Sequence, residues 1–487
     1  MKKSRKSEDV SLNVICPVCS AWKNKPCVHT KGARKGKRRE ESHSDRTRLA
    51  RVKLSSSAKE KLDKADREVK KEDRRSARAK SRNEKASKAK ERLTDEQQEV
   101  VDVINEKIEV LGKHAQFVGP VSVGPIISTY RYLPLARTKV AHLESIHKDV
   151  AVALGAEAVL IKRMPGESAV GFFIPNKERQ IVQFRDTLSH AVEFMQDARD
   201  HSEDKNWHLP IPVNFGITAD GEPYVDDLTS LPHLLIAGTT GGGKSTLLHA
   251  VVDTVCWTMS PDEIKLIISD TKGVEFKHFD ALPHLWHPIA TNLYHTMNYL
   301  QNAIDETQDR LDKFGMQGVR NIHEYNERQP AEKKMPYIII VIDELADLMG
   351  PSLERSEAKM NSDKLSTVVA RSRASGIYCI AATQRPDVKQ IKGSIKANFP
   401  ARLSFRLPSL ADSKTIINTK GAEGLMMKGD MLYMSSTSPE LKRLHAPYMT
   451  LEESKDMITM IVKRHAVEET MENVLGKVGT EQKASVN

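Results

Sequence analysis

Residues 234–245 have the sequence LLIAGTTGGGKS, in which an apolar run is followed directly by the pattern G-x-x-x-x-G-K-[ST]. The next residues, 246–252 (TLLHAVV), have the composition of a helix. Glycines between a strand and a helix allow consecutive backbone N–H groups to surround a phosphate, and the helix N-terminus adds partial positive charge. The stretch therefore predicts a phosphate-binding loop in an α/β fold.

The residues of this loop have distinct predicted roles in holding ATP. Lys244 is expected to reach the β- and γ-phosphates, and the Ser245 hydroxyl is expected to bind Mg²⁺. The predicted nucleotide-binding residues are Gly238, Thr239, Thr240, Gly241, Gly242, Gly243, Lys244, Ser245 and Thr246. A chance match in a glycine-rich turn is the alternative, and the strand-loop-helix context argues against it.

A second motif lies at residues 337–344, with the sequence YIIIVIDE. The apolar run predicts a buried strand, and ligands of α/β sheets bind at the carboxyl ends of strands. Asp343 is predicted to bind Mg²⁺, and Glu344 is predicted to polarise the attacking water. An acidic pair at a strand end can also be a solvated terminus, but the phosphate loop favours the catalytic role.

Three further side chains are candidates for sensing or completing the site. Gln384 follows the apolar run 378–382, where it could contact the γ-phosphate or simply form a strand-end turn. Arg371 and Arg373 precede that run, and either could serve as an arginine finger in a neighbouring subunit. Surface arginines are common, so a plain surface role is the alternative for both.

The apolar runs predict an α/β fold with a parallel sheet and crossover helices from about residue 209 to residue 434. A small α+β unit is expected before it, at 96–190. Thr94 and Gln97 predict a capping box at the start of its first helix. The expected strands of the larger sheet are 234–237, 264–269, 337–342, 378–381 and 402–406. In the smaller unit we expect a helix at 142–155 and strands at 158–162 and 169–174.

Composition and charge exclude several classes of protein. The chain has 487 residues and five cysteines, and no stretch approaches the length of apolar residues that a membrane helix needs. A disulfide scaffold and an integral membrane protein are therefore not expected. Residues 1–93 contain 31 Lys+Arg and 13 Asp+Glu, a net charge of +18, whereas the rest of the chain carries −8. This asymmetry predicts a polyanion-binding N-terminal arm.

The arm begins with a cysteine cluster that predicts a Zn²⁺ site. Cys16, Cys19 and Cys27 have the spacing of a zinc knuckle, and the fourth ligand is either His29 or His43. Cys27 and His29 are only two residues apart, which is a cramped geometry. The pattern C-P-x-C-x-A…P-C…H-x-x-R resembles small zinc-binding, DNA-binding modules common in phage and actinobacterial proteins, and this resemblance favours His43. Three surface thiols are the alternative. The basic run 34–39 (RKGKRR) follows and fits contact with a nucleic-acid backbone. Cys256 and Cys379 lie in apolar patterns and are expected in the core.

The order of these motifs resembles the FtsK/SpoIIIE family of DNA translocases over about residues 100–450. The first ones are 238–245 (GTTGGGKS), 268–275 (ISDTKGVE), 282–285 (LPHL), 318–322 (GVRNI) and 324–326 (EYN). They continue with 341–349 (VIDELADLM), 373–377 (RASGI), 382–386 (ATQRP), 395–398 (IKAN), 412–413 (DS), 421–423 (GAE) and 429–433 (GDMLY). Upstream, 124–125 (GP), 165–166 (PG), 170–171 (VG), 175–176 (PN) and Arg179 resemble the family's α domain.

The resemblance implies a RecA-like P-loop ATPase that assembles into a ring, usually a hexamer, and pumps double-stranded DNA. It assigns Lys244 and Ser245 to the Walker A motif and the acidic pair at 343–344 to Walker B. Arg373 falls on the arginine of the R-A-x-G-I segment and is preferred as the finger, and Gln384 falls on the sensor position. Asp270 and Lys272 match a D-P-K segment, with Thr271 in place of proline.

Two departures from the family lead to expectations about context. A membrane-spanning N-terminus and a C-terminal sequence-reading module are not recognisable, which favours a cytoplasmic motor, in the host cytoplasm if phage-encoded. The phage-like zinc module favours a phage or mobile element. A conjugation or genome-packaging ATPase is the first alternative, and a zinc-containing DNA-binding regulator is the second.

The predicted organisation has five parts. Residues 1–50 are a zinc-binding basic module and 51–95 a basic linker, which is either solvated and partly helical or lies along nucleic acid. Residues 96–204 form the α domain, 205–450 the RecA-like motor domain, and 451–487 a C-terminal surface helix and tail.

Overall fold

The computed structural model describes residues 93–135, 138–164, 166–201, 208–350, 353–384, 386, 393–437 and 440–466. The predicted zinc module, nearly all of the basic linker, and the tail after residue 466 lie outside these described residues.

A small α+β unit opens the described chain, as the sequence predicted. Its sheet has the order β1-β3-β5-β4, with β2 paired to β3, and all these pairings are antiparallel. The elements are α3 (Asp95–Val110), β1 (Ala115–Phe117), β2 (Ser122–Val123), β3 (Ile127–Pro134), α4 (Val140–Ser145), α5 (His147–Ala153), β4 (Leu160–Arg163) and β5 (Val170–Pro175). The capping box predicted from Thr94 and Gln97 is confirmed at the start of α3.

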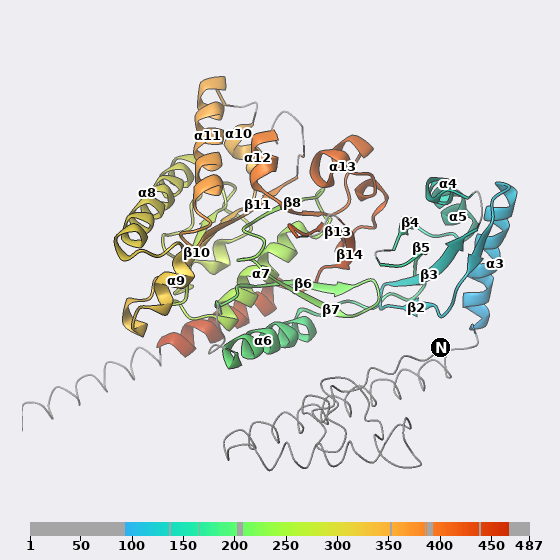
Figure 1. Ribbon diagram of the computed structural model, residues 1–487, viewed down its shortest axis with the longest axis horizontal. Helices are drawn as coiled ribbons and strands as arrows, with labels where there is room; N and C mark the ends of the chain where they lie inside the picture. The colour runs from blue at the N-terminus through green and yellow to red at the C-terminus, as the bar shows by residue number, and fades with distance from the viewer. Residues whose placement is uncertain are drawn as a thin grey trace, which may run out of the picture. The chain divides into compact units, whose positions relative to one another are not determined.

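A nine-stranded sheet forms the larger part of the fold, with the order β7-β6-β14-β13-β12-β8-β11-β10-β9 (Figure 1). Its strands are β6 (Pro212–Thr218), β7 (Pro223–Asp227), β8 (His233–Ala237), β9 (Ile264–Ser269), β10 (Tyr337–Ile342), β11 (Ile377–Thr383), β12 (Ala401–Ser404), β13 (Asp430–Met434) and β14 (Leu441–His445). Its helices are α6 (Phe184–Asp200), α7 (Lys244–Thr258), α8 (Leu293–Gln317), α9 (Ile322–Glu327), α10 (Leu345–Met349), α11 (Arg355–Arg371), α12 (Gly393–Asn398) and α13 (Leu410–Ile417). Short 3₁₀ turns lie at η2 (Lys277–Phe279), η3 (Ala331–Lys333) and η4 (Ala422–Gly424).

The five expected strands of this sheet are confirmed, but the sheet is mixed and not wholly parallel. Strands β12, β8, β11, β10 and β9 are parallel, while β7, β6, β14 and β13 extend the sheet with antiparallel pairings. The reason is the length of the connections. The loops between β6 and β7 and between β13 and β14 are too short for the crossover that a parallel pair requires.

Both faces of the parallel strands are buried, which explains their continuous apolar sequences. Alternate residues of β8, β10 and β11 enter two different cores: Leu234 and Ile339 pack with α6 and α7, whereas Leu235 and Ile340 pack with α8 and α11. The two helix pairs accordingly lie on opposite sides of the sheet in Figure 1.

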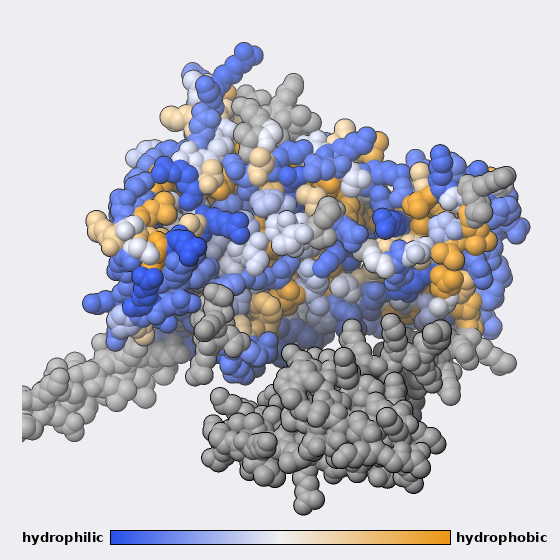
Figure 2. Space-filling view, in the orientation of Figure 1, coloured by the Kyte–Doolittle hydropathy of each residue, from blue (hydrophilic) through white to orange (hydrophobic). Residues whose placement is uncertain are grey.

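The outer surface contrasts with these cores. Hydrophilic residues predominate among the described atoms on the face drawn in Figure 2, and hydrophobic residues form smaller patches between them. Within the described part of the chain, no helix is both long and apolar enough to cross a membrane.

A surface helix was expected within residues 451–487. The structure has a helix at 451–466, and one of its faces is buried against α7. Met457, Ile458 and Ile461 join the core that contains α7. The Ser454 hydroxyl of this helix donates a hydrogen bond of 2.7 Å to Asp253 Oδ2 on α7, and His278 Nε2 lies 3.1 Å from the same hydroxyl. The helix therefore packs against α7, the helix that begins at the phosphate loop.

Asp253 is fully buried, and its Oδ1 has no hydrogen-bond partner among the described residues. Burial raises the pKa of this carboxyl from 3.8 to about 8. The folded protein therefore holds a proton that the unfolded chain releases, so the free energy of unfolding falls as pH rises from about 4 towards about 8.

We predict that Asp253→Asn removes this pH dependence, because an amide has no charge to desolvate. The variant should gain stability relative to the natural protein as pH rises from about 6 to about 8, by up to about 1.4 kcal/mol per pH unit. Urea unfolding at each pH measures the difference. Asp309→Asn, at an exposed position of α8, is the matched control. Equal pH slopes for Asp253→Asn and the natural protein would contradict the prediction.

Candidate functional site

The predicted phosphate-binding residues, from Gly238 to Thr246, lie between the end of β8 and the first turn of α7. Gly243 is the N-cap of α7 and has a φ of +115°. This left-handed conformation is accessible to glycine and strained for other residues. Glycine at this position therefore allows the chain to turn directly from the strand into the helix.

Neighbouring strands press closely against the same loop. A Cβ atom at Gly238 would lie 2.7 Å from the Cβ of Phe405, which follows β12. The N–H of Gly429, just before β13, donates a hydrogen bond of 2.8 Å to the carbonyl oxygen of Gly242. The shape of the loop is thus supported from outside by two other segments of the sheet.

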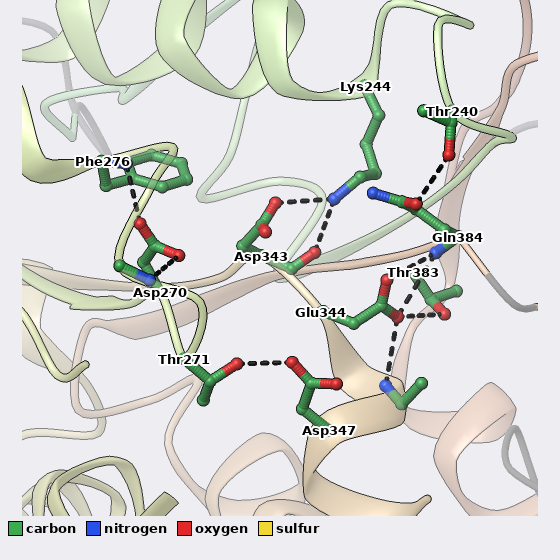
Figure 3. Close-up of polar contacts among 12 residues, drawn as sticks. Thr240, Lys244, Asp270, Thr271, Phe276, Asp343, Glu344, Asp347, Thr383 and Gln384 are labelled. Atoms are coloured by element: carbon green, nitrogen blue, oxygen red, sulfur yellow. Dashed lines mark hydrogen bonds and ion pairs between the residues drawn. The ribbon is translucent and has the colours of Figure 1, made fainter. Parts of the chain in front are cut away.

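Lys244 and Asp343 form a buried ion pair at this edge. Lys244 is 4% exposed and Asp343 is 2% exposed. The Lys244 Nζ lies 2.6 Å from Asp343 Oδ1 and 2.7 Å from the Asp343 carbonyl oxygen (Figure 3). Removing one partner of a buried pair costs roughly 3–5 kcal/mol, so each charge stabilises the other. The pair brings the helix after β8 into contact with the end of β10.

Glu344 follows Asp343 and is the N-cap of α10. Its Oε1 accepts hydrogen bonds from the Thr383 hydroxyl at 2.7 Å and from Ala346 N at 3.2 Å, and its Oε2 accepts one from Gln384 N at 3.0 Å. The side chain of Gln384 also contacts the phosphate loop, since its Oε1 accepts from the Thr240 hydroxyl at 2.9 Å. Lys244, Asp343, Glu344 and Gln384 are thus brought together at one edge, as Figure 3 shows.

The loop after β9 borders the site on its other side. Asp270 is fully buried, and its two oxygens accept hydrogen bonds from Gly273 N at 3.0 Å and Phe276 N at 2.9 Å. The hydroxyl of Thr271 donates to the Asp347 carboxylate on α10. Asp270 therefore shapes its own turn, while Thr271 connects that turn to the helix that begins after Glu344.

The donor set at this edge fits ATP and Mg²⁺. The left-handed Gly243 leads into the N-terminus of α7, where backbone N–H groups and the helix dipole favour a phosphate. Lys244 can exchange its carboxylate partner for phosphate oxygens. Ser245, in the first turn of α7, and Asp343 would offer a hydroxyl and a carboxylate oxygen, which are ligand types that Mg²⁺ prefers.

The two arginine candidates lie away from this edge of their own chain. Arg373 is exposed in the turn between α11 and β11, and Arg371 is the last residue of α11, where it donates to Gln308 Oε1 at 3.0 Å. Because β11 is parallel to β8 and β10, the start of β11 lies at the opposite edge from the phosphate loop. Seven residues of strand separate the two edges by about 20 Å.

The predicted zinc ligands Cys16, Cys19, Cys27 and His43, with the alternative His29, all lie outside the described residues. In the part of the chain that is described, no group of three or more His, Cys, Asp or Glu is placed to hold a metal ion. Cys256 and Cys379 are buried in the core, as predicted, and burial raises the pKa of both thiols.

Sequence reasoning missed two polar residues that organise the site, Thr383 and Asp347. Thr383 stands directly before Gln384 at the end of an apolar run, so its place at a strand end was visible. Its contact with Glu344 depends on β11 lying between β8 and β10, which the order of motifs along the chain does not reveal. Asp347 resembled any polar residue of a short helix.

Comparison with known proteins finds relatives for most of the chain. "DNA translocase FtsK" of Helicobacter pylori is 36% identical over 348 residues, covering 71% of this chain and 39% of that protein. "DNA translocase FtsK" of Staphylococcus aureus is 34% identical over 356 residues, covering 71% of this chain and 43% of that protein. The chain thus spans about two fifths of the length of these curated relatives.

A solved structure described as the pCW3 conjugation coupling protein TcpA, monomer form with ATPgS, has the same fold. Its TM-score is 0.51 at 22% identity, and the match covers 74% of this chain and 98% of that one.

Two family models match consecutive parts of the chain. Residues 79–176 match the FtsK alpha domain, and residues 195–388 match the FtsK/SpoIIIE family. Together they cover more than half of the chain, and the second contains the phosphate loop, the acidic pair and Gln384. By these matches, residues 79–176 and 195–388 are similar to the FtsK alpha domain and to the FtsK/SpoIIIE family, and the fold is that of a P-loop ATPase.

Proposed function

We propose that this chain hydrolyses ATP at the carboxyl edge of its larger sheet. The observation that carries the proposal is the ion pair of Lys244 with Asp343, at 2.6 Å, directly beside Glu344. Mg²⁺, held by Ser245 and Asp343, would neutralise phosphate charge there. Lys244 would bind phosphate oxygens, and Glu344 would orient the attacking water and accept its proton.

We further propose that hydrolysis drives movement along double-stranded DNA by a ring of identical subunits, with six as the expected number. The proposal is supported by the matches to the FtsK/SpoIIIE family and FtsK alpha domain models and by relatives at 34–36% identity that are named DNA translocases. A conjugation or genome-packaging motor would use the same nucleotide site with a different partner. The test must therefore include movement without any other protein.

We predict that duplex DNA raises the ATPase rate more than single-stranded DNA does, and that the protein displaces a triplex strand from linear duplex unaided. Lys244→Ala should abolish hydrolysis because phosphate binding is lost. Glu344→Gln should lower kcat by about 10²–10⁴-fold and keep nucleotide binding, because only water activation is lost. A rate that is equal with duplex, single strands and no DNA would contradict the motor, and displacement only with a portal or relaxase would favour the alternative.

We propose that Arg373 completes the site of a neighbouring subunit. The support is its exposure and its location at the edge opposite the phosphate loop of its own chain. A guanidinium supplied in trans would stabilise charge that develops on the transferred phosphoryl group.

We predict that Arg373→Ala and Lys244→Ala proteins, each inactive alone, regain ATPase activity when they are mixed. In a mixed ring, the intact Lys244 of one subunit meets the intact Arg373 of the other. Mixing each variant with the natural protein is the control for exchange of subunits. If subunits exchange and the mixture of variants stays inactive, Arg373 does not act in trans.

We propose that the N-terminal arm binds Zn²⁺ through Cys16, Cys19, Cys27 and either His43 or His29, and that it loads the motor on DNA. The support is the ligand spacing and the net charge of +18 over residues 1–93.

We predict one Zn²⁺ per full-length chain by elemental analysis. Cys16→Ser with Cys19→Ser should remove the metal and weaken stimulation of the ATPase by DNA at moderate salt, while basal hydrolysis stays unchanged. Separate His29→Ala and His43→Ala proteins identify the fourth ligand by which one loses zinc. A natural protein without zinc, or unchanged DNA stimulation in the double variant, would contradict the respective part of the proposal.

A further inference from the structure

The two oxygens of Glu344 have unequal surroundings. Oε1 accepts from the Thr383 hydroxyl at 2.7 Å, from Ala346 N at 3.2 Å and from Gln384 N at 3.3 Å. Oε2 accepts only the shared Gln384 N–H among the hydrogen bonds of the described residues, at 3.0 Å. A carboxylate oxygen has about two acceptor positions. The acceptor capacity of Oε1 is therefore used by the protein, whereas Oε2 keeps a free lone pair.

Only one of these donors is a side chain. The N–H groups of Ala346 and Gln384 belong to the backbone and would be present with almost any residue at these positions. The Thr383 hydroxyl makes the shortest contact, and hydrogen bonds to a charged acceptor are roughly twice as strong as neutral ones. Thr383 is 1% exposed, so water does not replace its hydroxyl easily. The orientation of the carboxylate thus depends on residue 383 in particular.

Thr383 is also joined to the phosphate loop. In the register of the sheet it pairs with Ala237, the last residue of β8, and its carbonyl oxygen accepts from Gly238 N at 3.2 Å. Figure 3 shows the Thr383 hydroxyl and the Gln384 backbone converging on Glu344, with Oε2 pointing away from α10 towards the side on which Lys244 lies. The end of β11 therefore fixes the position of Glu344 relative to the phosphate loop.

We propose that Thr383 is a positioning residue for Glu344, holding Oε1 so that Oε2 is the oxygen that receives the attacking water. This inference rests on the proposed ATPase activity and adds a residue and an atom to it. Gln384 shares the role through its backbone, and its side chain connects the same point to Thr240 of the loop. Without the Thr383 hydroxyl, the Glu344 carboxylate could rotate, and Oε2 would then no longer be held towards the attacking water.

The test is Thr383→Val, which keeps the branched shape and removes the donor. We expect kcat to fall about 10-fold to 100-fold, as for the loss of a hydrogen bond to a charged group, with the Kd for ATP changed by less than about threefold. Thr383→Ser should restore kcat to within about threefold. Thr129→Val is the matched control, since Thr129 is a fully buried threonine of β3 whose hydroxyl has no hydrogen bond among the described residues.

The double variant separates positioning from a structural effect. In single-turnover measurements, Thr383→Val should have almost no further effect in a Glu344→Gln background, because the residue acts through the carboxylate. A kcat equal to that of the natural protein in Thr383→Val, a loss not rescued by serine, or additive losses in the double variant would overturn the proposal. If the natural protein itself does not hydrolyse ATP, the proposed function fails, and this outcome is distinct from the others.

Discussion

The buried ion pair between Lys244 and Asp343 constrains the whole carboxyl edge of the larger sheet. The two residues follow β8 and β10, which are not neighbours, because β11 lies between them. Two charges removed from water are tolerated only at close range and with good geometry. The end of β11 therefore lies between the two charged residues, and it supplies partners for Glu344. Thr383 donates its hydroxyl to Glu344, and Gln384 donates its backbone N–H.

Segments that follow β12 and precede β13 support the phosphate loop from outside. Phe405 and Gly429 touch the loop, and both lie more than 150 residues further along the chain. The segment around Gly429 is itself held by a buried pair in which Arg443 Nη2 lies 2.7 Å from Asp430 Oδ2. The loop is thus set in place by strands that bear none of the predicted catalytic residues. Because the loop is already ordered, binding of a phosphate would cost less conformational entropy than it would in a flexible loop.

The sequence predicted the strands well because burial on both faces makes them continuously apolar. β9 and β10 have the expected bounds, and the capping box at Thr94 is present. The antiparallel pairing of β6, β7, β13 and β14 was not predicted, because the sequence of an apolar strand does not show in which direction its neighbour runs. Lys244 and Glu344 were identified from local motifs. The contacts of Glu344 with its partners Thr383 and Gln384 were not, because a contact between the ends of β10 and β11 depends on which strands are neighbours in the sheet, and no local pattern records that order.

The turn that carries Arg373 combines an exposed side chain with a fixed backbone. Arg310, 2% exposed on α8, donates from Nη1 to the carbonyl oxygens of Pro336 at 2.8 Å and Ser375 at 2.9 Å. The Ser375 hydroxyl in turn donates to the carbonyl oxygen of Ser372 at 2.8 Å. A buried guanidinium keeps its charge only with such partners, so the turn and the arginine order each other. Because the backbone of this turn is already ordered, Arg373 would lose less conformational entropy on contact with a neighbouring subunit than an arginine on a flexible loop would. The two opposite edges of the sheet therefore share one feature. Lys244 at one edge and Arg373 at the other are charged residues on backbone segments that other elements hold in place.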